Sequence, residues 1–205
     1  MQPFSVLFLI GLACISQVSG GKEISANGTF ANRYYYNAIN VSNGGPWGTW
    51  TWLDMCPEHY YAMGFSIKVE EYGGASDDTA LNGIRLFCIK INSSSSTVYT
   101  VESDSGKFGQ WSGITWCPTG FLISFQLRVE RPQGIADDTS ANNVKFRCSS
   151  GAIIERTGGS FGDYGGWSKA CTRGSICGIE TKQDPYHGPF VDDTMLNDVQ
   201  FFCCD

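Results

Sequence analysis

The sequence predicts an all-β domain in which three equivalent units of strands surround one shared core. Two short markers recur three times in the same order, and apolar residues alternate with other residues between them. Alternation with a period of two is typical of strands. Clusters of Gly, Asn, Asp and Pro interrupt these segments about every eight to twelve residues, a pattern that does not favour helices. Because each unit needs a partner for its apolar face, we expect a closed, pseudo-threefold arrangement.

The first twenty residues predict a secretory signal peptide. They contain no Asp, Glu, Lys or Arg, their centre from Phe4 to Ile15 is mostly apolar, and Val18-Ser19-Gly20 offers small residues at a cleavage point. An apolar run this short is typical of a signal peptide and not of a membrane span. No later stretch is apolar for long enough to cross a bilayer, so we expect a soluble, secreted chain without membrane contact.

Cysteines and glycosylation sequons agree with export. Nine cysteines become eight once Cys14 is removed with the signal, and an even number in a secreted chain predicts a disulfide framework. The sequons at Asn27, Asn40 and Asn92 predict N-glycosylation.

The charge of the chain excludes one class of partner. The formal net charge is −6 and the sequence pI is about 4.9. An acidic surface repels phosphate backbones, so we expect no nucleic-acid partner, whereas basic proteins are favoured.

The first marker is Asp-Asp-Thr-x-x-Asn. It occupies residues 77–82, 137–142 and 192–197, and in each copy a cysteine lies eleven residues after the first aspartate. Apolar residues alternate between the marker and the cysteine, as Ile84 and Leu86 do, so we expect a strand there.

The paired aspartates of this marker have two interpretations. Two carboxylates can act as acid and base in glycoside hydrolysis, but Asp side chains also accept hydrogen bonds from backbone amides in turns. A catalytic pair is needed once, whereas a fold-forming turn is needed in every unit, so we interpret the pairs as structural. Calcium binding is a further interpretation, but the spacing of an EF-hand loop is absent. The residues are Asp77, Asp78, Asp137, Asp138, Asp192 and Asp193.

The second marker is Gly-x-aromatic-Gly-x-Trp, which we place at residues 45–50, 106–111 and 162–167. A cysteine follows each copy, and apolar residues then alternate again, more weakly in the third copy at Ile179 and Thr181. The resulting repeats span about residues 43–90, 103–150 and 158–205 of a single domain at residues 21–205.

The repeats also predict disulfides. The equivalent pairs of the first two units are Cys56–Cys88 and Cys117–Cys148, so the natural third pair is Cys171–Cys203, which leaves Cys177–Cys204 to tie down the carboxyl terminus. Adjacent residues of a strand point to opposite faces. The swapped alternative therefore stays open at this stage, with Cys171 bonded to Cys204 and Cys177 bonded to Cys203.

The two markers and the terminal Phe202-Cys203-Cys204 together resemble the vitelline membrane outer layer protein 1 family. The similarity runs from about Asn43 to the last residue and includes residues 42–45, 47–50 and 80–86. The resemblance implies a β-prism, in which three Greek-key sheets related by a pseudo-threefold axis form the faces of a prism. The family is named for a protein coat around the egg yolk, and its fold is shared with some carbohydrate-binding domains. Fold sharing alone does not define a site.

Aromatic residues supply the candidate contact surface. We expect the marker tryptophans Trp50, Trp111 and Trp167 to pack in the core or at a prism end, because large aromatics dominate cores. The less regular aromatics are better candidates for an exposed glycan-binding surface. These are Trp47, Trp52, Trp116, Tyr34, Tyr35 and Tyr36.

No catalytic or metal-binding constellation stands out. Residues 158–162 match Gly-x-Ser-x-Gly, but this pattern needs a strand-to-helix turn and here it overlaps the aromatic marker, so we interpret it as a chance match. His59 and His187 lie at unrepeated positions, and the cysteines are committed to disulfides, so we expect no zinc site. We expect no cofactor, no other metal and no catalytic residue.

The leading functional hypothesis is a secreted, monomeric, disulfide-rich structural component of an extracellular coat or secretion that binds glycans or basic glycoproteins. Two alternatives are a carbohydrate-active enzyme, which hydrolyses or transfers N-acetylglucosamine oligomers, and a lectin proper.

Overall fold

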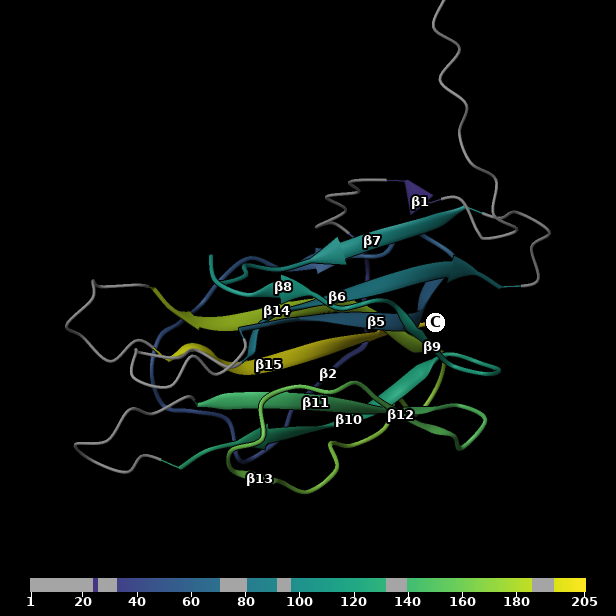
Figure 1. Cartoon of the computed structure of the whole chain (residues 1–205). Coiled ribbons are helices and arrows are strands. Elements are labelled where there is room, and N and C mark those ends of the chain that lie inside the picture. The colour runs from purple at the N-terminus through teal and green to yellow at the C-terminus, as the bar shows by residue number, and fades with distance from the viewer. Residues whose placement is uncertain (1–23, 26–32, 71–80, 92–96, 132–139, 186–193) are drawn as a thin grey trace, which may run out of the picture.

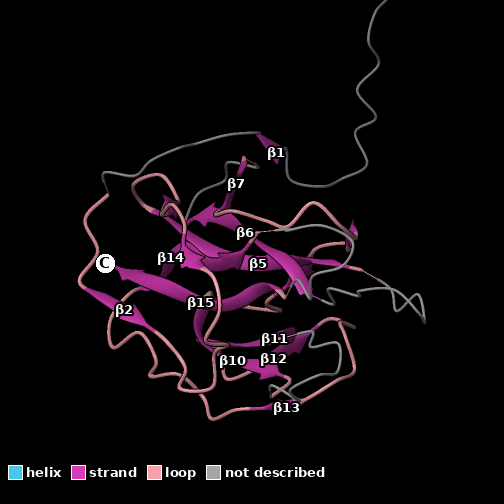
Figure 2. Ribbon diagram, turned by 90° about the vertical axis from the view of Figure 1, so that its left-hand side faces the viewer, coloured by secondary structure: helices cyan, strands magenta, loops and turns pink. Residues whose placement is uncertain are grey.

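The computed structural model describes residues 24–25, 33–70, 81–91, 97–131, 140–185 and 194–205, and these residues form strands, turns and loops but no helix. The strands form three sheets whose inner faces meet in a common core (Figures 1 and 2). The predicted all-β fold and the β-prism that the resemblance implies are therefore confirmed. A search of the same ranges finds no helix that could cross a bilayer.

Several predicted residues lie outside the described ranges. Of the three sequon asparagines, only Asn40 lies within the described ranges, and it is exposed to solvent. The residues outside are the signal segment 1–20, Asn27, Asn92, Asp77, Asp78, Asp137, Asp138, Asp192 and Asp193.

Each sheet is built on one long antiparallel strand pair from one sequence unit. Sheet 1 has the order β1 (Ile24–Ser25), β7 (Val98–Glu102), β6 (Leu81–Lys90), β5 (Tyr60–Val69) and β8 (Gln110–Trp111), and β9 (Thr115–Trp116) also pairs with β5. Sheet 2 has the order β12 (Ile153–Glu155), β11 (Ala141–Cys148), β10 (Leu122–Val129) and β13 (Asp163–Tyr164). Sheet 3 has the order β2 (Asn37–Ile39), β15 (Met195–Cys204), β14 (Ser175–Asp184) and β3 (Thr49–Trp50), and β4 (Asp54–Met55) also pairs with β14.

The short strands at the end of each aromatic marker and just after it do not join the sheet of their own sequence unit. β8 and β9 come from the second unit but complete sheet 1, and β13 comes from the third unit but completes sheet 2. The ring closes because β3 and β4 of the first unit pair with β14 in sheet 3. The sheets are therefore out of phase with the sequence repeats, and each seam between sheets is crossed by the chain.

The backbone corrects the position of the third aromatic marker. Gly48, Gly109 and Gly162 all have φ between 68° and 78°, a region that favours glycine. A Cβ on any of them would lie between 2.2 and 2.4 Å from a backbone carbonyl group of the neighbouring long strand. The third copy is thus residues 159–164, and the predicted position at 162–167 is wrong. In this register the last residue is Tyr164 where the other two copies have Trp, so the sequence pattern favours 162–167, and the positive φ of Gly162 identifies the equivalent position.

The two markers meet at each seam. The glycine that begins each aromatic marker donates its backbone N–H to the carbonyl of the marker asparagine of another unit at 2.6–2.8 Å, and these asparagines are fully buried. The pairs are Gly45 with Asn197, Gly106 with Asn82, and Gly159 with Asn142. The asparagines of the first marker are therefore structural.

Four phenylalanines form the centre of the core. Phe65 comes from sheet 1, Phe125 and Phe146 from sheet 2, and Phe201 from sheet 3, and none has exposed surface. Ring centroids are 4.8 Å apart for Phe65–Phe146, 4.7 Å for Phe125–Phe201 and 5.1 Å for Phe146–Phe201, in the tilted and edge-on arrangements that aromatic rings prefer. The cluster joins all three sheets.

Three of the four disulfides cross from one sheet to the next. In each of them, the first cysteine donates its backbone N–H to a carbonyl of a long strand in one sheet. The sulfur of the same cysteine is bonded to a cysteine in a long strand of the neighbouring sheet. The bonds are Cys56–Cys88 from sheet 3 to sheet 1, Cys117–Cys148 from sheet 1 to sheet 2, and Cys171–Cys203 from sheet 2 to sheet 3. The fourth, Cys177–Cys204, joins β14 to β15 within sheet 3, and the swapped pairing does not form.

Removal of equivalent disulfides tests the equivalence of the seams. Cys56–Cys88 and Cys117–Cys148 close loops of 32 and 31 residues. The chain-entropy model gives about 3–4 kcal/mol for each. We expect the double variants Cys56→Ser/Cys88→Ser and Cys117→Ser/Cys148→Ser to lose similar free energies of unfolding in denaturant titrations. A harmless loss in one variant and a failure to fold in the other would contradict the equivalence.

Glycine substitutions test the corrected marker. Gly109→Ala combines a positive φ with overlap between the new methyl group and the Val69 carbonyl, whereas Gly151→Ala meets a positive φ but no atom within 4 Å. The φ strain costs about 1–2 kcal/mol at both positions. We expect Gly109→Ala to lose at least about 2 kcal/mol more stability than this matched control, because β8 must move away from β5. Equal losses would show that the close approach is not required.

Candidate functional site

The aromatic markers place one ring on the outer side of each sheet. In the strand register Trp50 lies opposite Lys182, Trp111 opposite Lys68 and Tyr164 opposite Arg128. Neighbouring residues of a strand point to opposite faces. The residue before each of these cations in its strand, namely Ile67, Leu127 or Thr181, is buried in the core. The cations and the rings opposite them therefore lie on the outer faces of the sheets.

Two of these three rings are covered by a cation. The Arg85 guanidinium lies 3.8 Å from the centroid of the Trp111 ring, and the Lys145 ammonium lies 3.9 Å from the centroid of the Tyr164 ring. Cations placed over aromatic faces are held there by the ring quadrupole. The two cations occupy equivalent positions in β6 and β11, so this cover is part of the threefold pattern.

The third ring is uncovered because the equivalent residue is neutral. Gln200 of β15 stands at the register position of Arg85 and Lys145, and its amide donates a hydrogen bond to Glu180 of β14. Trp50 consequently has no cation over its ring from any of the described residues, and it is 42% exposed. One amino-acid difference between the repeats therefore opens one aromatic face.

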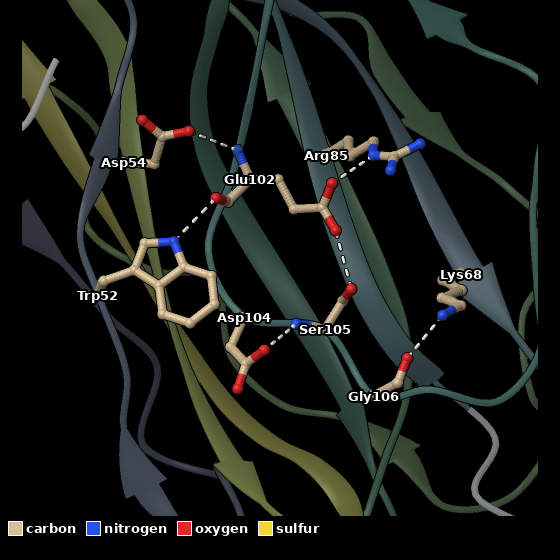
Figure 3. Close-up of polar contacts among 8 residues, drawn as sticks. All are labelled: Trp52, Asp54, Lys68, Arg85, Glu102, Asp104, Ser105 and Gly106. Atoms are coloured by element: carbon tan, nitrogen blue, oxygen red, sulfur yellow. Dashed lines mark hydrogen bonds and ion pairs between the residues drawn. The ribbon is translucent and has the colours of Figure 1, made fainter. Parts of the chain in front are cut away.

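Trp50 belongs to a short segment, residues 47–52, that exposes three tryptophans. Trp47 is 55% exposed and Trp52 is 52% exposed. Trp52 is oriented by its indole Nε1–H, which donates to the Glu102 carbonyl at 3.3 Å (Figure 3). We call residues 47–52 the tryptophan segment.

Buried hydrogen bonds fix this segment to sheet 1. Asp54 accepts a hydrogen bond from the Glu102 backbone N–H at 2.9 Å, and the Ser103 hydroxyl donates to the Trp52 carbonyl at 2.6 Å (Figure 3 shows the first contact). The Thr51 hydroxyl lies 2.8 Å from the same Ser103 hydroxyl. Asp54 and Ser103 are both buried, so the network is shielded from water. The tryptophans therefore stand on a rigid support.

Polar contacts between sheet 3 and the residues that follow β7 of sheet 1 explain the weak apolar alternation of the third repeat. Thr181 and Gln183 replace apolar residues of the other long strands and are buried. The Thr181 hydroxyl and the Gln183 amide donate to the Asp104 carbonyl at 2.8 and 3.0 Å. Buried polar groups need such partners. The third repeat thus replaces apolar packing with polar contacts beside the tryptophan segment.

Two pockets flank this part of the chain. One, of about 260 Å³, is lined by residues that include Thr49, Thr51, Asp104 and Gln183. The other, of about 670 Å³, is lined by residues 42–46, by the end of β10 at residues 129–131 and by residues 162–165. They occupy equivalent positions at two seams.

A carboxyl group with an unusual pKa lies beside the larger pocket. Burial raises the pKa of Asp198 from 3.8 to about 6, although the Val199 N–H, which donates to it at 2.8 Å, and Lys182 both favour the charged form. A Cβ on Gly44, a pocket residue, would lie 2.1 Å from the Asp198 Cγ. Only glycine fits against this carboxyl group.

The predicted tyrosines do not join the tryptophans. β2, which they precede, and β3 lie at opposite edges of sheet 3. Tyr34 is 81% exposed, Tyr35 packs edge-on against Phe202 at 4.7 Å, and the Tyr36 hydroxyl accepts a hydrogen bond from the Arg173 N–H at 2.9 Å. Tyr36 is therefore an anchor at the sheet edge, and Tyr34 is left as a free exposed ring.

Two expectations about tryptophans are corrected by the structure. Trp116, expected to be exposed, is half-buried and packs against Phe87 at 5.8 Å in a small cluster outside sheet 1. The marker tryptophans, expected in the core or at a prism end, do not enter the core, because the phenylalanine cluster and the aliphatic residues of the long strands fill it, and Trp50 and Trp111 pair near the ends of β14 and β5. Trp167 belongs to no marker, and its ring lies 4.3 Å from the Arg147 guanidinium.

Sequence reasoning missed Gln200 and Glu180. A signal was present, because Arg85, Lys145 and Gln200 each lie eight residues after the first aspartate of their repeat. Only a comparison of the repeats position by position reveals that the cation is lost in the third.

The three sheets define a β-prism protein, and solved structures share this fold. An artocarpin–mannopentose complex matches with a TM-score of 0.51 and 12% identity over 84% of this chain and 100% of that chain. A mannose-specific jacalin-related lectin from Morus nigra, in complex with mannose, matches with a TM-score of 0.52 and 12% identity over 85% of this chain and 97% of that chain. At this identity the likeness concerns the fold alone.

Sequence relatives identify the family. Residues 37–205 match the model of the vitelline membrane outer layer protein I family. The vitelline membrane outer layer protein 1 homolog of Mus musculus is 47% identical over 97% of this chain and 95% of its own length, and that of Homo sapiens is 50% identical over 83% and 84%. The chain belongs to the vitelline membrane outer layer protein I family, as the sequence predicted.

The Asp198 carboxyl group predicts a pH dependence. Its pKa in the folded protein, about 6, lies above the ordinary value of 3.8, so between these values the folded state binds a proton that the unfolded state has lost. Stability therefore falls as the pH rises through this window. We expect Asp198→Asn to be more stable than the unmodified chain at pH 7, by about 1 kcal/mol after allowance for partial exposure.

Urea titrations at several pH values measure this difference. The two stability curves should converge below about pH 3, where the carboxyl group is protonated in both the folded and the unfolded state. Sheet 2 already carries Asn143 at the equivalent position, so the amide is compatible with the fold. Parallel curves between pH 4 and 7 would contradict the assignment.

Proposed function

We propose that the protein is a non-enzymatic, glycan-binding component of an extracellular coat or secretion, and that Trp50 is the ring on which a sugar packs. The observation that carries this proposal is the open Trp50 face at a position where Arg85 and Lys145 cover the equivalent rings. The name of the family supports a role in a coat. The mannose and mannopentose complexes of two structures with the same fold support a sugar as ligand.

The chemistry of the open face suits a saccharide. A tryptophan ring offers a large, rigid apolar surface for the C–H face of a sugar ring at little cost in conformational entropy. The Glu180 carboxylate and the Gln200 amide beside it can accept and donate hydrogen bonds to hydroxyl groups. A sugar at the position of the missing cation would gain both kinds of contact.

A binding role needs a rigid, accessible surface, and the tryptophan segment has both properties. The Trp52 carbonyl accepts a hydrogen bond from the Ser103 hydroxyl, and Asp54, two residues after the segment, accepts one from the Glu102 N–H, while the three tryptophan rings are 42–55% exposed. Preorganised side chains lose little freedom on binding. Secretion through the segment 1–20 and N-glycosylation at Asn27, Asn40 and Asn92 are part of this proposal and remain predictions.

Two substitutions, at Trp50 and at Gln200, test the open face from both directions. Trp50→Ala removes the ring, and Gln200→Arg supplies the cation that covers it in the other sheets. We expect each to weaken binding to immobilised chito-oligosaccharides or oligomannose at least about tenfold, which is about 1.4 kcal/mol. Tyr34→Ala, which removes an exposed ring at the opposite edge of sheet 3, should leave binding unchanged.

The same experiment separates the alternatives. Retention of full affinity in both Trp50→Ala and Gln200→Arg, with the fold intact, would overturn the proposed site. The oligosaccharides recovered after incubation are analysed by mass spectrometry. Shortened or extended products that disappear in a single Asp→Asn variant would assign a carbohydrate-active enzyme instead.

A further inference from the structure

The part of the chain that contains sheet 2 is more positive than the rest of this acidic protein, although one of its cations, Arg173, is paired with Asp205. Residues 122–173 contain seven of the 14 Lys and Arg residues but five of the 20 Asp and Glu residues, while the whole chain has a formal net charge of −6. This part of the chain is therefore positive and the remainder is strongly negative. Segregated charge of this kind creates a local potential that attracts anions to one face.

Two cations stand side by side on the outer face of this sheet. Lys145 and Arg147 alternate along β11 with the buried Val144, Phe146 and Cys148, so they point away from the core. Two residues along a strand separate them by about 7 Å. Both are half-buried and held by rings of the following segment, Lys145 by Tyr164 at 3.9 Å and Arg147 by Trp167 at 4.3 Å.

Neither cation forms an ion pair with any residue that the structure describes. In the strand register Arg147 lies between Ser124 of β10 and Ile153 of β12, neither of which carries charge. The Ser124 hydroxyl is buried and has no hydrogen-bond partner in the described part of the chain. The Arg147 guanidinium thus keeps its charge and its N–H donors available beside an unused hydroxyl group.

The acidic residue nearest to Lys145 is committed elsewhere. Glu155 lies opposite Lys145, but its Oε1 accepts hydrogen bonds from the Tyr164 hydroxyl at 2.6 Å and from the Asn143 amide at 3.2 Å. In sheet 1 the equivalent cation behaves differently, because Arg85 pairs with Glu102 at 2.5 Å (Figure 3). Glu155 keeps its charge, but among the described residues it forms no ion pair with Lys145, whereas Arg85 at the equivalent position of sheet 1 does form one.

We propose that the outer face of sheet 2 binds an anionic saccharide, with Arg147 and Lys145 receiving two neighbouring sulfate or carboxylate groups. A ring-stacked guanidinium presents its planar edge to oxygen pairs, which is the geometry of bidentate anion recognition. The aromatic rings beside the cations offer apolar contact for sugar C–H groups. An acidic peptide fits less well, because extended peptides are recognised at sheet edges and these cations lie on a face.

This site is independent of the proposed function, since it lies on a different sheet from Trp50. The test measures binding of the disulfide-intact chain to a sulfated oligosaccharide, a sialylated oligosaccharide and a neutral chito-oligosaccharide at about 50 and about 200 mM salt. Arg147→Gln removes the stacked guanidinium. Lys90→Gln is the matched control, because it removes an exposed charge from sheet 1.

We expect binding of at least one anionic probe that weakens with salt, and a further loss of at least tenfold in Arg147→Gln. Arg147→Lys, which keeps the charge, should retain part of the affinity, and Lys90→Gln should change it less than twofold. Trp50→Ala should leave anionic binding intact, which separates this site from the tryptophan segment. Absence of anionic binding at low salt, equal losses in Arg147→Gln and Lys90→Gln, or equal binding of a polyglutamate peptide would overturn the proposal.

Discussion

Closure of a ring of three sheets is the constraint on which the rest of the structure depends. No sheet is completed by its own sequence unit, so β5, β10 and β14 each need a marker strand from another unit. Unpaired strand edges are exposed to wrong pairing. At every seam the same elements secure the exchange, namely a left-handed glycine, a buried asparagine carbonyl and a disulfide to the next sheet.

Because closure uses the same residues three times, chemistry specific to one face arises where the repeats differ. The marker aromatics are equivalent in the backbone, yet Arg85 and Lys145 cover two of them and Gln200 leaves Trp50 open. The difference between Arg85 and Lys145 is of the same kind, since only Arg85 has a carboxylate partner within ion-pair distance. The repeated frame supplies rigidity, and single substitutions on it supply different surfaces.

Much of the fold was predictable from the sequence because repetition and period-two alternation are local signals. They predict the long strand pairs, the threefold core and the pairing of Cys56 with Cys88. They do not predict that β3 completes sheet 3, because that pairing joins the two ends of the chain. The third marker was misplaced because it ends in Tyr164 where the other two copies have Trp, so the sequence pattern favours 162–167, and the positive φ of Gly162 identifies the equivalent position.

The candidate site was less predictable, for a physical reason. Exposure of a tryptophan depends on what lies above its ring, and the cover of Trp111 comes from a different strand. The sequence identifies Trp47 and Trp52 as exposed, and they are, but it favours packing for Trp50, which is 42% exposed, and exposure for Trp116, which is partly buried against Phe87.

The most direct test of the central claim is a titration of the tryptophan indole N–H signals by NMR with a neutral oligosaccharide. If broken symmetry creates the site, the Trp50 signal shifts in a saturable way and the cation-covered Trp111 signal stays in place. Equal shifts of both signals, or a shift of Trp111 without Trp50, would contradict the account.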